Sequence, residues 1–258
     1  MKTLKIGDLL ARLPIIQGGM GVGISLSGLA SAVANQGGVG VISSAGLGVI
    51  YREHSKDYNT ASIWGLREEL RKAREKTKGI IGVNVMVAMS NFADMVRTAI
   101  AEKADIIFSG AGMPLNLPSF LTKGSKTKLA PIVSSARAAK LICEKWLANY
   151  KYVPDAIVVE GPKAGGHLGY KPEQITDEHF SQIGCCPKSF RKFVVSARRT
   201  TRTSRSSQQA ASTRAKTFIA SWSWAPTVSR WARASSPRRS ATPRRSSSGV
   251  TSKPLNRT

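Results

Sequence analysis

The chain has 258 residues and a net charge of +24, and its length suits a single α/β barrel of about 250 residues. The charge is uneven: 22 basic and 15 acidic residues precede Cys185, whereas 17 basic and no acidic residues follow from there. The front part therefore carries only +7, which does not indicate a nucleic-acid-binding domain. Three cysteines without a CxxC spacing exclude a disulfide framework and a cysteine-type metal site.

The first sixteen residues, MKTLKIGDLLARLPII, are too polar and interrupted for a secretion signal. No apolar run approaches the roughly 18 residues that a membrane span requires. We therefore expect a cytoplasmic protein without a membrane partner.

Over residues 1–180, short β-branched runs alternate with helical patterns, which predicts βαβ units and a parallel sheet. The expected strands are PIIQ (14–17), VGVIS (39–43), IIGVNVMV (80–87), DIIFSG (105–110), APIVSS (130–135) and AIVVEG (156–161). A (β/α)8 TIM-type barrel needs two more strands. The pattern thus predicts an α/β barrel that is incomplete at about six strands.

Two helices are expected between the early strands. One covers residues 27–36 and is ended by Gly37 and Gly38. The other, LREELRKAREKT (66–77), is highly charged and is predicted to be mostly solvated.

A third helix is expected to begin at Ser134 or Ser135, either of which can cap it, and to continue to about Tyr150. Apolar side chains recur in it at positions i, i+3, i+4 and i+7, which is typical of a core-facing stripe. This stripe consists of Ala139, Ile142, Cys143 and Trp146.

From Ser181 the composition changes to Arg, Ser, Thr and Pro without a sustained period of 2 or 3.6. Such a segment buries too little apolar surface to offset its ordering entropy. Residues 181–258 are therefore expected to form a basic, low-complexity tail that does not supply the missing strands, and residues 1–180 to form the partial barrel.

The genetic code offers a specific origin for this tail. If each codon is rebuilt from the third base of one codon and the first two of the next, residues 208–218 permit AAGGIYTGED and residues 222–236 permit ELGADGVQMGTRFV. Both strings are typical of barrel strands that end in glycine. We interpret the tail as the product of a frameshift near residues 181–186.

Several strand ends carry glycine or a polar side chain. Gly18, Gly19 and Met20 follow the first predicted strand, where backbone N–H groups could approach a flat or anionic ligand, although a tight turn has the same sequence. Asn84 is a polar residue inside an apolar strand and needs a partner, either a ligand or neighbouring backbone. Ser109 and Gly110 repeat the strand-to-glycine pattern, and such ends on one face suggest a single site.

The segment GPKAGGHLGY (161–170) follows an apolar strand and contains a glycine pair, Gly165 and Gly166, directly before His167. A histidine after a barrel strand lies at the face where such barrels carry their chemistry. Its ordinary pKa allows proton transfer near neutrality. We predict a catalytic role for His167 rather than a structural one, and expect Glu160 to bind a cofactor or orient its neighbours.

Together, QGGM (17–20), GVNVM (82–86), SGAG (109–112) and AGGHLG (164–169) resemble the nitronate monooxygenase family, and the flavin-type enoyl-ACP reductases are similar. The resemblance implies a (β/α)8 barrel with FMN at the carboxyl ends of its strands. It implies FMN contacts from the backbone around Gly18, Gly19 and Met20, from Asn84, and from the segment between Glu160 and Gly166. His167 matches the active-site histidine, whereas Lys163 stands where many members have Glu.

The implied reaction is the oxidation of an alkyl nitronate by O2 to a carbonyl compound and nitrite or a related nitrogen oxide. Members of the family end in two further strands, the last of which holds the FMN phosphate, and both appear only in the alternative reading frame. The chain as it stands is therefore expected to bind FMN weakly or not at all.

Two alternatives remain open. A flavin-dependent enoyl-ACP reductase would share the barrel but consume NADH or NADPH. Nucleic-acid binding through the tail, with Trp222, Trp224 and Trp231 as a stacking platform, belongs to a different class. Any peptide of charge +17 binds polyanions non-specifically, so no specific nucleic-acid partner is expected.

Overall fold

The computed structural model describes residues 3–162, 164–165, 169–175 and 218–222. They all belong to one compact unit, Met1–Ser223, whereas the second unit, Trp224–Thr258, lies outside the described residues.

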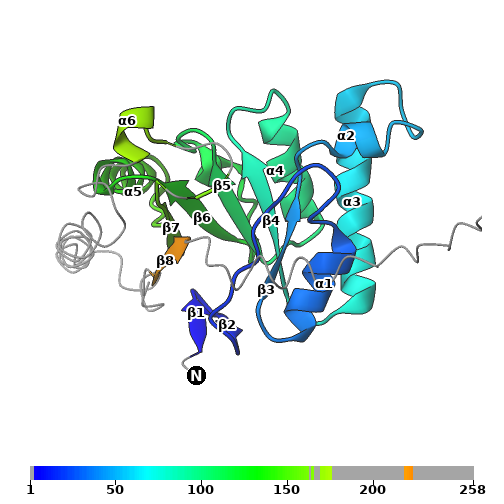
Figure 1. Cartoon of the computed structure of the whole chain (residues 1–258), viewed down its shortest axis with the longest axis horizontal. Coiled ribbons are helices and arrows are strands. Elements are labelled where there is room, and N and C mark those ends of the chain that lie inside the picture. The colour runs from blue at the N-terminus through cyan, green and yellow to red at the C-terminus, as the bar shows by residue number, and fades with distance from the viewer. Residues whose placement is uncertain (1–2, 163, 166–168, 176–217, 223–258) are drawn as a thin grey trace, which may run out of the picture. The chain divides into compact units, whose positions relative to one another are not determined.

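Within the described residues, a parallel sheet contains six strands in sequential order (Figure 1). These are β3 (Val39–Ser43), β4 (Ile80–Met86), β5 (Ile106–Gly110), β6 (Lys128–Val133), β7 (Ala156–Glu160) and β8 (Phe218–Trp222). Each strand pairs in parallel with the next. The prediction of an incomplete α/β barrel is confirmed, and strands β3 to β7 lie within two residues of their predicted positions.

The predicted strand 14–17 is wrong in extent, because a single bridge between Ile16 and Val39 is all that remains of it. At Gln17 the side chain takes over the pairing: its Nε2 donates to Val41 O at 2.8 Å and its Oε1 accepts from Val41 N at 3.3 Å. The backbone therefore leaves the sheet at Gln17.

An antiparallel hairpin that the sequence did not predict precedes the sheet. Strands β1 (Leu4–Ile6) and β2 (Leu9–Ala11) pack their buried side chains against the inner core, which includes Phe108 and Val158. An ion pair of 2.8 Å joins Asp8 to Lys128 on β6, and this contact holds the pKa of Asp8 below its usual value. The hairpin thus lies at the amino ends of the strands.

Helices cover the outer face of the sheet (Figure 1), and their apolar side chains form one core with its outward-facing residues. Their bounds are α1 (Ser27–Asn35), α2 (Leu47–Ile50), α3 (Tyr58–Lys76), α4 (Phe92–Ala101), the 3-10 turn η1 (Leu117–Phe120) and α5 (Ala136–Tyr150). A further short helix, α6 (Pro172–Ile175), has no buried residue and is not part of this core. The helix predicted over 27–36 is confirmed as α1.

The expectation that residues 66–77 form a mostly solvated helix is wrong. Residues 66–76 belong to α3, which ends at Lys76, and the buried residues of this helix include Leu66, Glu69, Leu70 and Ala73. The high content of charged residues led to the wrong prediction, although positions 66, 69, 70 and 73 have the spacing of one buried helix face.

Helix α5 confirms its prediction, and Ser135 rather than Ser134 is its cap, accepting a hydrogen bond from Ala138 N. The predicted stripe of Ala139, Ile142, Cys143 and Trp146 is buried. Burial raises the pKa of the Cys143 thiol to about 12, so this cysteine is not a nucleophile near neutral pH.

The tail was expected to contain no strand, and this is wrong for residues 218–222. Strand β8 pairs with β7 in register from Ala156 with Phe218 to Glu160 with Trp222. Its five residues form an isolated apolar run among basic and hydroxyl residues, too short for a periodicity argument.

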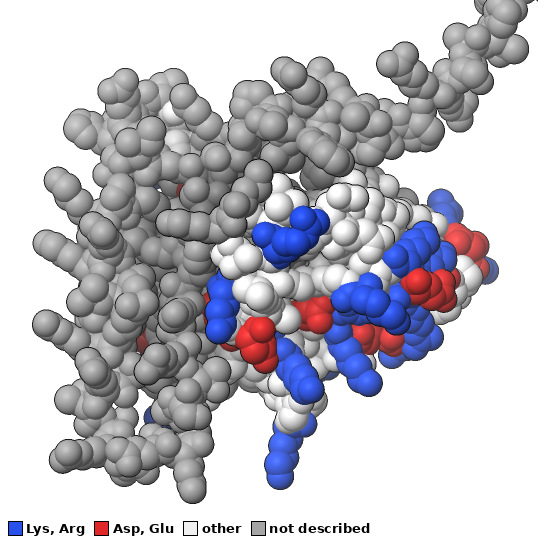
Figure 2. Space-filling view, turned by 90° about the horizontal axis from the view of Figure 1, so that it is seen from below, with Lys and Arg blue, Asp and Glu red and all other residues white. Residues whose placement is uncertain are grey.

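The outer helical face carries charges of both signs. Figure 2, which views the molecule from below relative to Figure 1, also shows Lys and Arg side chains among Asp and Glu side chains on the described part of that side. Arg71 pairs with Glu102 at 2.8 Å and Lys72 with Glu68 at 3.1 Å. Interspersed charge of this kind does not form the basic stripe of a nucleic-acid-binding surface.

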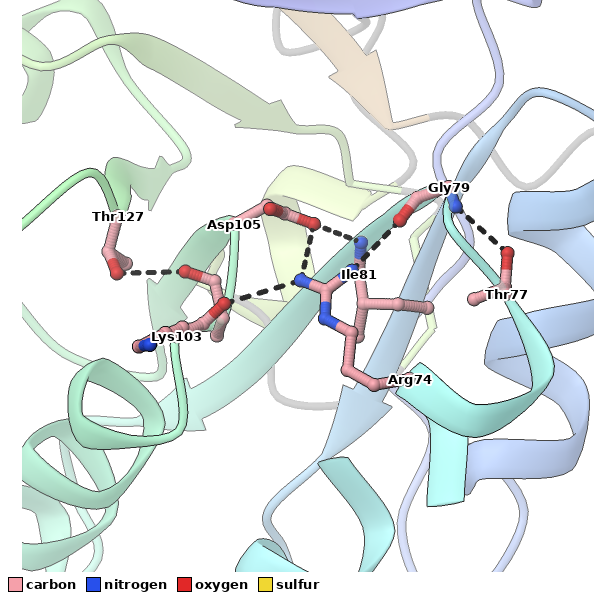
Figure 3. Close-up of polar contacts among 8 residues, drawn as sticks. Arg74, Thr77, Gly79, Ile81, Lys103, Asp105 and Thr127 are labelled. Atoms are coloured by element: carbon pink, nitrogen blue, oxygen red, sulfur yellow. Dashed lines mark hydrogen bonds and ion pairs between the residues drawn. The ribbon is translucent and has the colours of Figure 1, made fainter. Parts of the chain in front are cut away.

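Asp105, directly before β5, ties three segments together at the amino ends of the strands (Figure 3). Its Oδ2 accepts from Ile81 N and from Arg74 Nη2, each at 2.7 Å, and its own N–H donates to Ile81 O at 2.9 Å. The other guanidinium nitrogen of Arg74 donates to Gly79 O at 3.0 Å. Asp105 thus joins β4, β5 and α3.

The same arrangement recurs at Asp155, directly before β7. Its Oδ2 accepts from Leu129 N at 3.0 Å, and its N–H donates to Leu129 O at 3.1 Å. Tyr152 also donates to this carboxylate. Burial raises the pKa of Asp155 despite these hydrogen bonds.

Replacing Asp105 by Ala should lower the free energy of unfolding by about 1–3 kcal/mol, because Ile81 N and the Arg74 guanidinium lose their charged acceptor. Urea denaturation followed by circular dichroism measures the change. Glu68→Ala is the matched control, since it breaks a partly exposed i,i+4 pair worth about 1 kcal/mol or less. Equal losses in the two variants would contradict a special role for Asp105.

Candidate functional site at the carboxyl ends of the strands

The strand register places selected side chains at the inner, carboxyl end of the sheet. Paired residues of neighbouring strands share a face, and residues two apart on one strand do likewise. Val41, Phe108 and Val158 belong to the inner core. Asn84 pairs with Phe108, and Glu160 lies two residues beyond Val158. Asn84 and Glu160 therefore face the same interior.

Ser109 does not join this group by its side chain. It pairs with Val85, which packs in the outer core under the helices. The Ser109 side chain is fully buried, and its Oγ has no hydrogen-bond partner among the described residues. Gly110 pairs with Met86 and follows the inner position of Phe108 by two, so it lies at the inner face.

After the bridge between Ile16 and Val39, the segment Gly18–Gly19–Met20 brings Gly19 next to Asn84 on β4. A Cβ built on Gly19 would lie 2.3 Å from Asn84 Cβ and 3.1 Å from its Oδ1. A Cβ on Gly21 would lie 3.6 Å from Ser43 Oγ. Of the predicted residues, Gly19 thus lies directly against Asn84, and Gly18 and Met20 are its neighbours in the chain.

Ser25 binds the backbone of this segment through its hydroxyl, and the sequence did not predict this role. Its hydroxyl donates to Gly18 O at 2.8 Å and accepts from Met20 N at 3.0 Å. It also accepts from Gln17 Nε2 at 3.1 Å. Ser25 is fully buried.

The glycine-rich segment runs into helix α1, an arrangement that can bind phosphate at a helix N-terminus. Here the position is already taken. A carboxylate oxygen of Glu69 on α3 accepts from Ser27 N, the first N–H of α1, at 2.5 Å, and the other oxygen accepts from the Tyr51 hydroxyl. Burial alone would raise the pKa of Glu69, but these hydrogen bonds outweigh it and the pKa is lowered. The first N–H of α1 is therefore not available to an anionic ligand.

Glu69→Gln should reduce the free energy of unfolding at pH 7 by about 1–3 kcal/mol, because Ser27 N and Tyr51 lose a charged acceptor. Since the folded pKa lies below the ordinary 4.5, the contribution is present above that pH and is lost as pH falls through the lowered pKa. The gap between the parent and the variant should therefore shrink from pH 7 towards pH 3. Glu75→Gln, on the exposed side of α3, is the control; a gap independent of pH would contradict the assignment.

The other side of the site is formed by residues 160 and 169–170. Gly169 N donates to Glu160 Oε2 at 3.3 Å, and the Tyr170 hydroxyl lies 2.9 Å from both Glu160 O and Ser134 O. A Cβ on Gly165 would meet nothing within 4 Å. The predicted residues Gly166 and His167, together with Lys163, lie outside the described residues.

Comparison with known proteins gives one family match and several partial relatives. A family model for nitronate monooxygenase matches residues 2–188. The Mycobacterium tuberculosis (3aS,4S,5R,7aS)-5-hydroxy-7a-methyl-1-oxo-octahydro-1H-indene-4-carboxyl-CoA dehydrogenase is 27% identical over 156 residues, which are 60% of this chain and 38% of that protein.

Two solved structures cover similar portions. FabK from Thermotoga maritima is 29% identical over 61% of this chain and 43% of FabK, with a TM-score of 0.48. Nitroalkane oxidase from Streptomyces ansochromogenes is 18% identical over 63% of this chain and 51% of the oxidase, with a TM-score of 0.50. The oxidase supports the fold. The chain spans about two fifths to one half of the length of these relatives.

No helix in the described part of the chain is long and apolar enough to cross a membrane. The same residues contain no group of three or more His, Cys, Asp or Glu side chains suited to a metal ion.

Proposed function

The chain belongs to the nitronate monooxygenase family, and from that premise we propose that it is an FMN-dependent oxidoreductase that converts alkyl nitronates and O2 into carbonyl compounds and nitrite. Small nitroalkanes in their anionic form are its proposed substrates, and the cytoplasm is its proposed location. No specific nucleic-acid partner is proposed.

The contact between Gly19 and Asn84 is the observation that carries the proposal. Asn84 is half-buried at the inner, carboxyl end of the sheet, and within the described residues its side-chain amide has no hydrogen-bond partner. A Cβ on Gly19 would collide with the Asn84 side chain, so only glycine lets the backbone lie directly against this amide. A planar heteroaromatic ring with polar edges, such as a flavin, fits an amide and a glycine backbone of this kind.

The predicted site residues have different roles. When bound, the flavin supplies the redox chemistry. The backbone of Gly18, Gly19 and Met20 and the Asn84 side chain hold one side of it, and Glu160, Gly165 and Gly166 hold the other. His167 orients the nitronate or accepts a proton, in keeping with the ordinary pKa of an imidazole. The backbone of Ser109 and Gly110 completes the inner rim.

We further propose that the reading frame is shifted near residues 181–186. The family match ends at residue 188, and no acidic residue follows Glu178. Barrels of this class hold phosphate after strands seven and eight, so the chain as it stands should bind FMN weakly. Sequencing the gene across codons 180–190 tests this directly, and DNA without a plausible second reading would contradict it.

Titration of the full chain with FMN, followed by quenching of flavin fluorescence, is the first test of function. A version read in the alternative frame after residue 181 should bind FMN stoichiometrically and take up O2 with the nitronate of 2-nitropropane. In that version His167→Ala should abolish O2 uptake while FMN binding persists. NADH or NADPH consumption with an enoyl thioester, without O2 uptake, would instead identify an enoyl reductase. If neither version binds flavin, the proposed function is wrong.

A further inference from the structure

We infer that Gln17 and Ser25 are positioning residues for the cofactor: they hold the Gly18–Met20 backbone away from β3 and decide which of its peptide groups can contact the flavin. The inference rests on the proposed function for the identity of the ligand. The hydrogen bonds that carry it belong to the protein alone.

The Gln17 side chain is where the loop leaves the sheet. Its amide bonds both backbone groups of Val41 and so occupies the position that the next residue of a strand would take. The second N–H of its Nε2 donates to Ser25 Oγ. With 7% of its surface exposed, the Gln17 amide has a partner for each N–H and for its oxygen.

The Ser25 hydroxyl is saturated in the same way. A hydroxyl can donate one hydrogen bond and accept two, and this one donates to Gly18 O and accepts from Met20 N and Gln17 Nε2. The Ser25 backbone adds a bond from its N–H to Met20 O at 3.0 Å and accepts from Ser43 N at 2.9 Å. The two ends of loop 18–25 are thus joined through the buried Ser25 hydroxyl, and the Ser25 backbone bonds to Ser43 on β3.

These bonds decide which peptide groups remain for a ligand. The N–H and C=O of Met20 and the C=O of Gly18 are all occupied by Ser25. Among the described residues, the N–H groups of Gly18 and Gly19 and the C=O of Gly19 have no partner. Two neighbouring N–H donors beside the Asn84 amide suit a ligand edge that presents hydrogen-bond acceptors, such as the carbonyl and imine edge of a flavin. Of the Gly18–Met20 backbone proposed above as a flavin contact, the peptide groups of Met20 are therefore occupied, and Gly18 and Gly19 carry the contact.

The experiment combines FMN titration with amide hydrogen exchange on the full-length chain. Ser25→Ala should raise the Kd for FMN roughly tenfold and speed exchange at Met20 N, which loses its acceptor. Ser31→Ala is the matched control, because Ser31 is also buried but its hydroxyl bonds only to Gly28 O within α1. It should leave both readouts unchanged. Ser25→Cys preserves the size of the side chain and should give an intermediate Kd if Ser25→Ala fails to fold.

Gln17→Ala tests the same unit from its other end. Because Gln17 and Ser25 share one hydrogen-bond chain, the double variant should bind FMN no more weakly than the worse single variant. Equal effects of Ser25→Ala and Ser31→Ala on the Kd, or unchanged exchange at Met20 N, would overturn the inference. If the unmodified chain binds no FMN at millimolar concentration, the same variants are titrated in the version read in the alternative frame after residue 181. Absence of binding in both versions would contradict the proposed function, whereas exchange at Met20 N decides the positioning role in either version.

Discussion

Trp146→Ala is expected to lower the free energy of unfolding by about 3–5 kcal/mol, the cost of removing a large aromatic side chain from a packed core. Trp146 is fully buried on α5, its Nε1 donates to Pro114 O at 2.9 Å, and its ring lies 6.1 Å from that of Tyr152. The variant would therefore lose core contacts and leave Pro114 O without its donor. Such a loss is a large part of the stability of an ordinary domain.

Urea denaturation followed by circular dichroism measures this loss of stability. Two further variants separate the contribution of the hydrogen bond from that of core packing. Trp146→Phe keeps most of the packing but removes the indole N–H, so it should cost less. Trp64→Ala removes the same side chain from a half-buried position, where it stacks on His54 at 3.4 Å. Similar losses for Trp64→Ala and Trp146→Ala would show that α5 is not part of the principal core.

Gly19→Ala is expected to weaken FMN binding by more than tenfold with little change in global stability. The new Cβ would lie 2.3 Å from Asn84 Cβ, a separation that two carbon atoms cannot hold. Either the loop or the Asn84 side chain must move, and both are proposed flavin contacts. Fluorescence titration with FMN measures the result in the full chain.

Gly28→Ala is the matched control, because a Cβ at Gly28 in α1 meets nothing within 4 Å. Alanine is also the better helix former by about 1 kcal/mol, so this variant should be slightly more stable and should bind FMN as the parent does. An unchanged Kd in Gly19→Ala would mean that the segment next to Asn84 does not contact the flavin.

The sequence predicted strands β3 to β7 because each is a short β-branched run between helical patterns, and such runs are buried on both faces of a parallel sheet. It failed at residues 14–17 for a specific reason. Gln17 replaces the backbone pairing with a side-chain amide, and a hydrophobic pattern cannot distinguish a strand from a chain that leaves the sheet there. The hairpin β1–β2 was missed because strands of three residues have no measurable period.

For the candidate site, the sequence identified the strand ends but not the residues behind them. Asn84 and Glu160 drew attention as polar residues at strand ends, and the register turns both to the same interior. Ser109 was grouped with them, although alternation along β5 turns its side chain to the helices. Ser25 could not be recognised, because a serine in a loop becomes notable only once its three hydrogen bonds are known.

The hydrogen bonds made by Asp105 and Asp155 join neighbouring strands in the same way at two places in the sheet. Each aspartate stands directly before one strand and accepts a hydrogen bond from the second residue of the preceding strand. The two aspartates are fifty positions apart, and the sequences around them differ. The two aspartates therefore fix the register of β5 on β4 and of β7 on β6 through a side chain as well as through backbone pairing. Both aspartates lie before residue 181, so the change in composition there alters neither of these side-chain contacts directly.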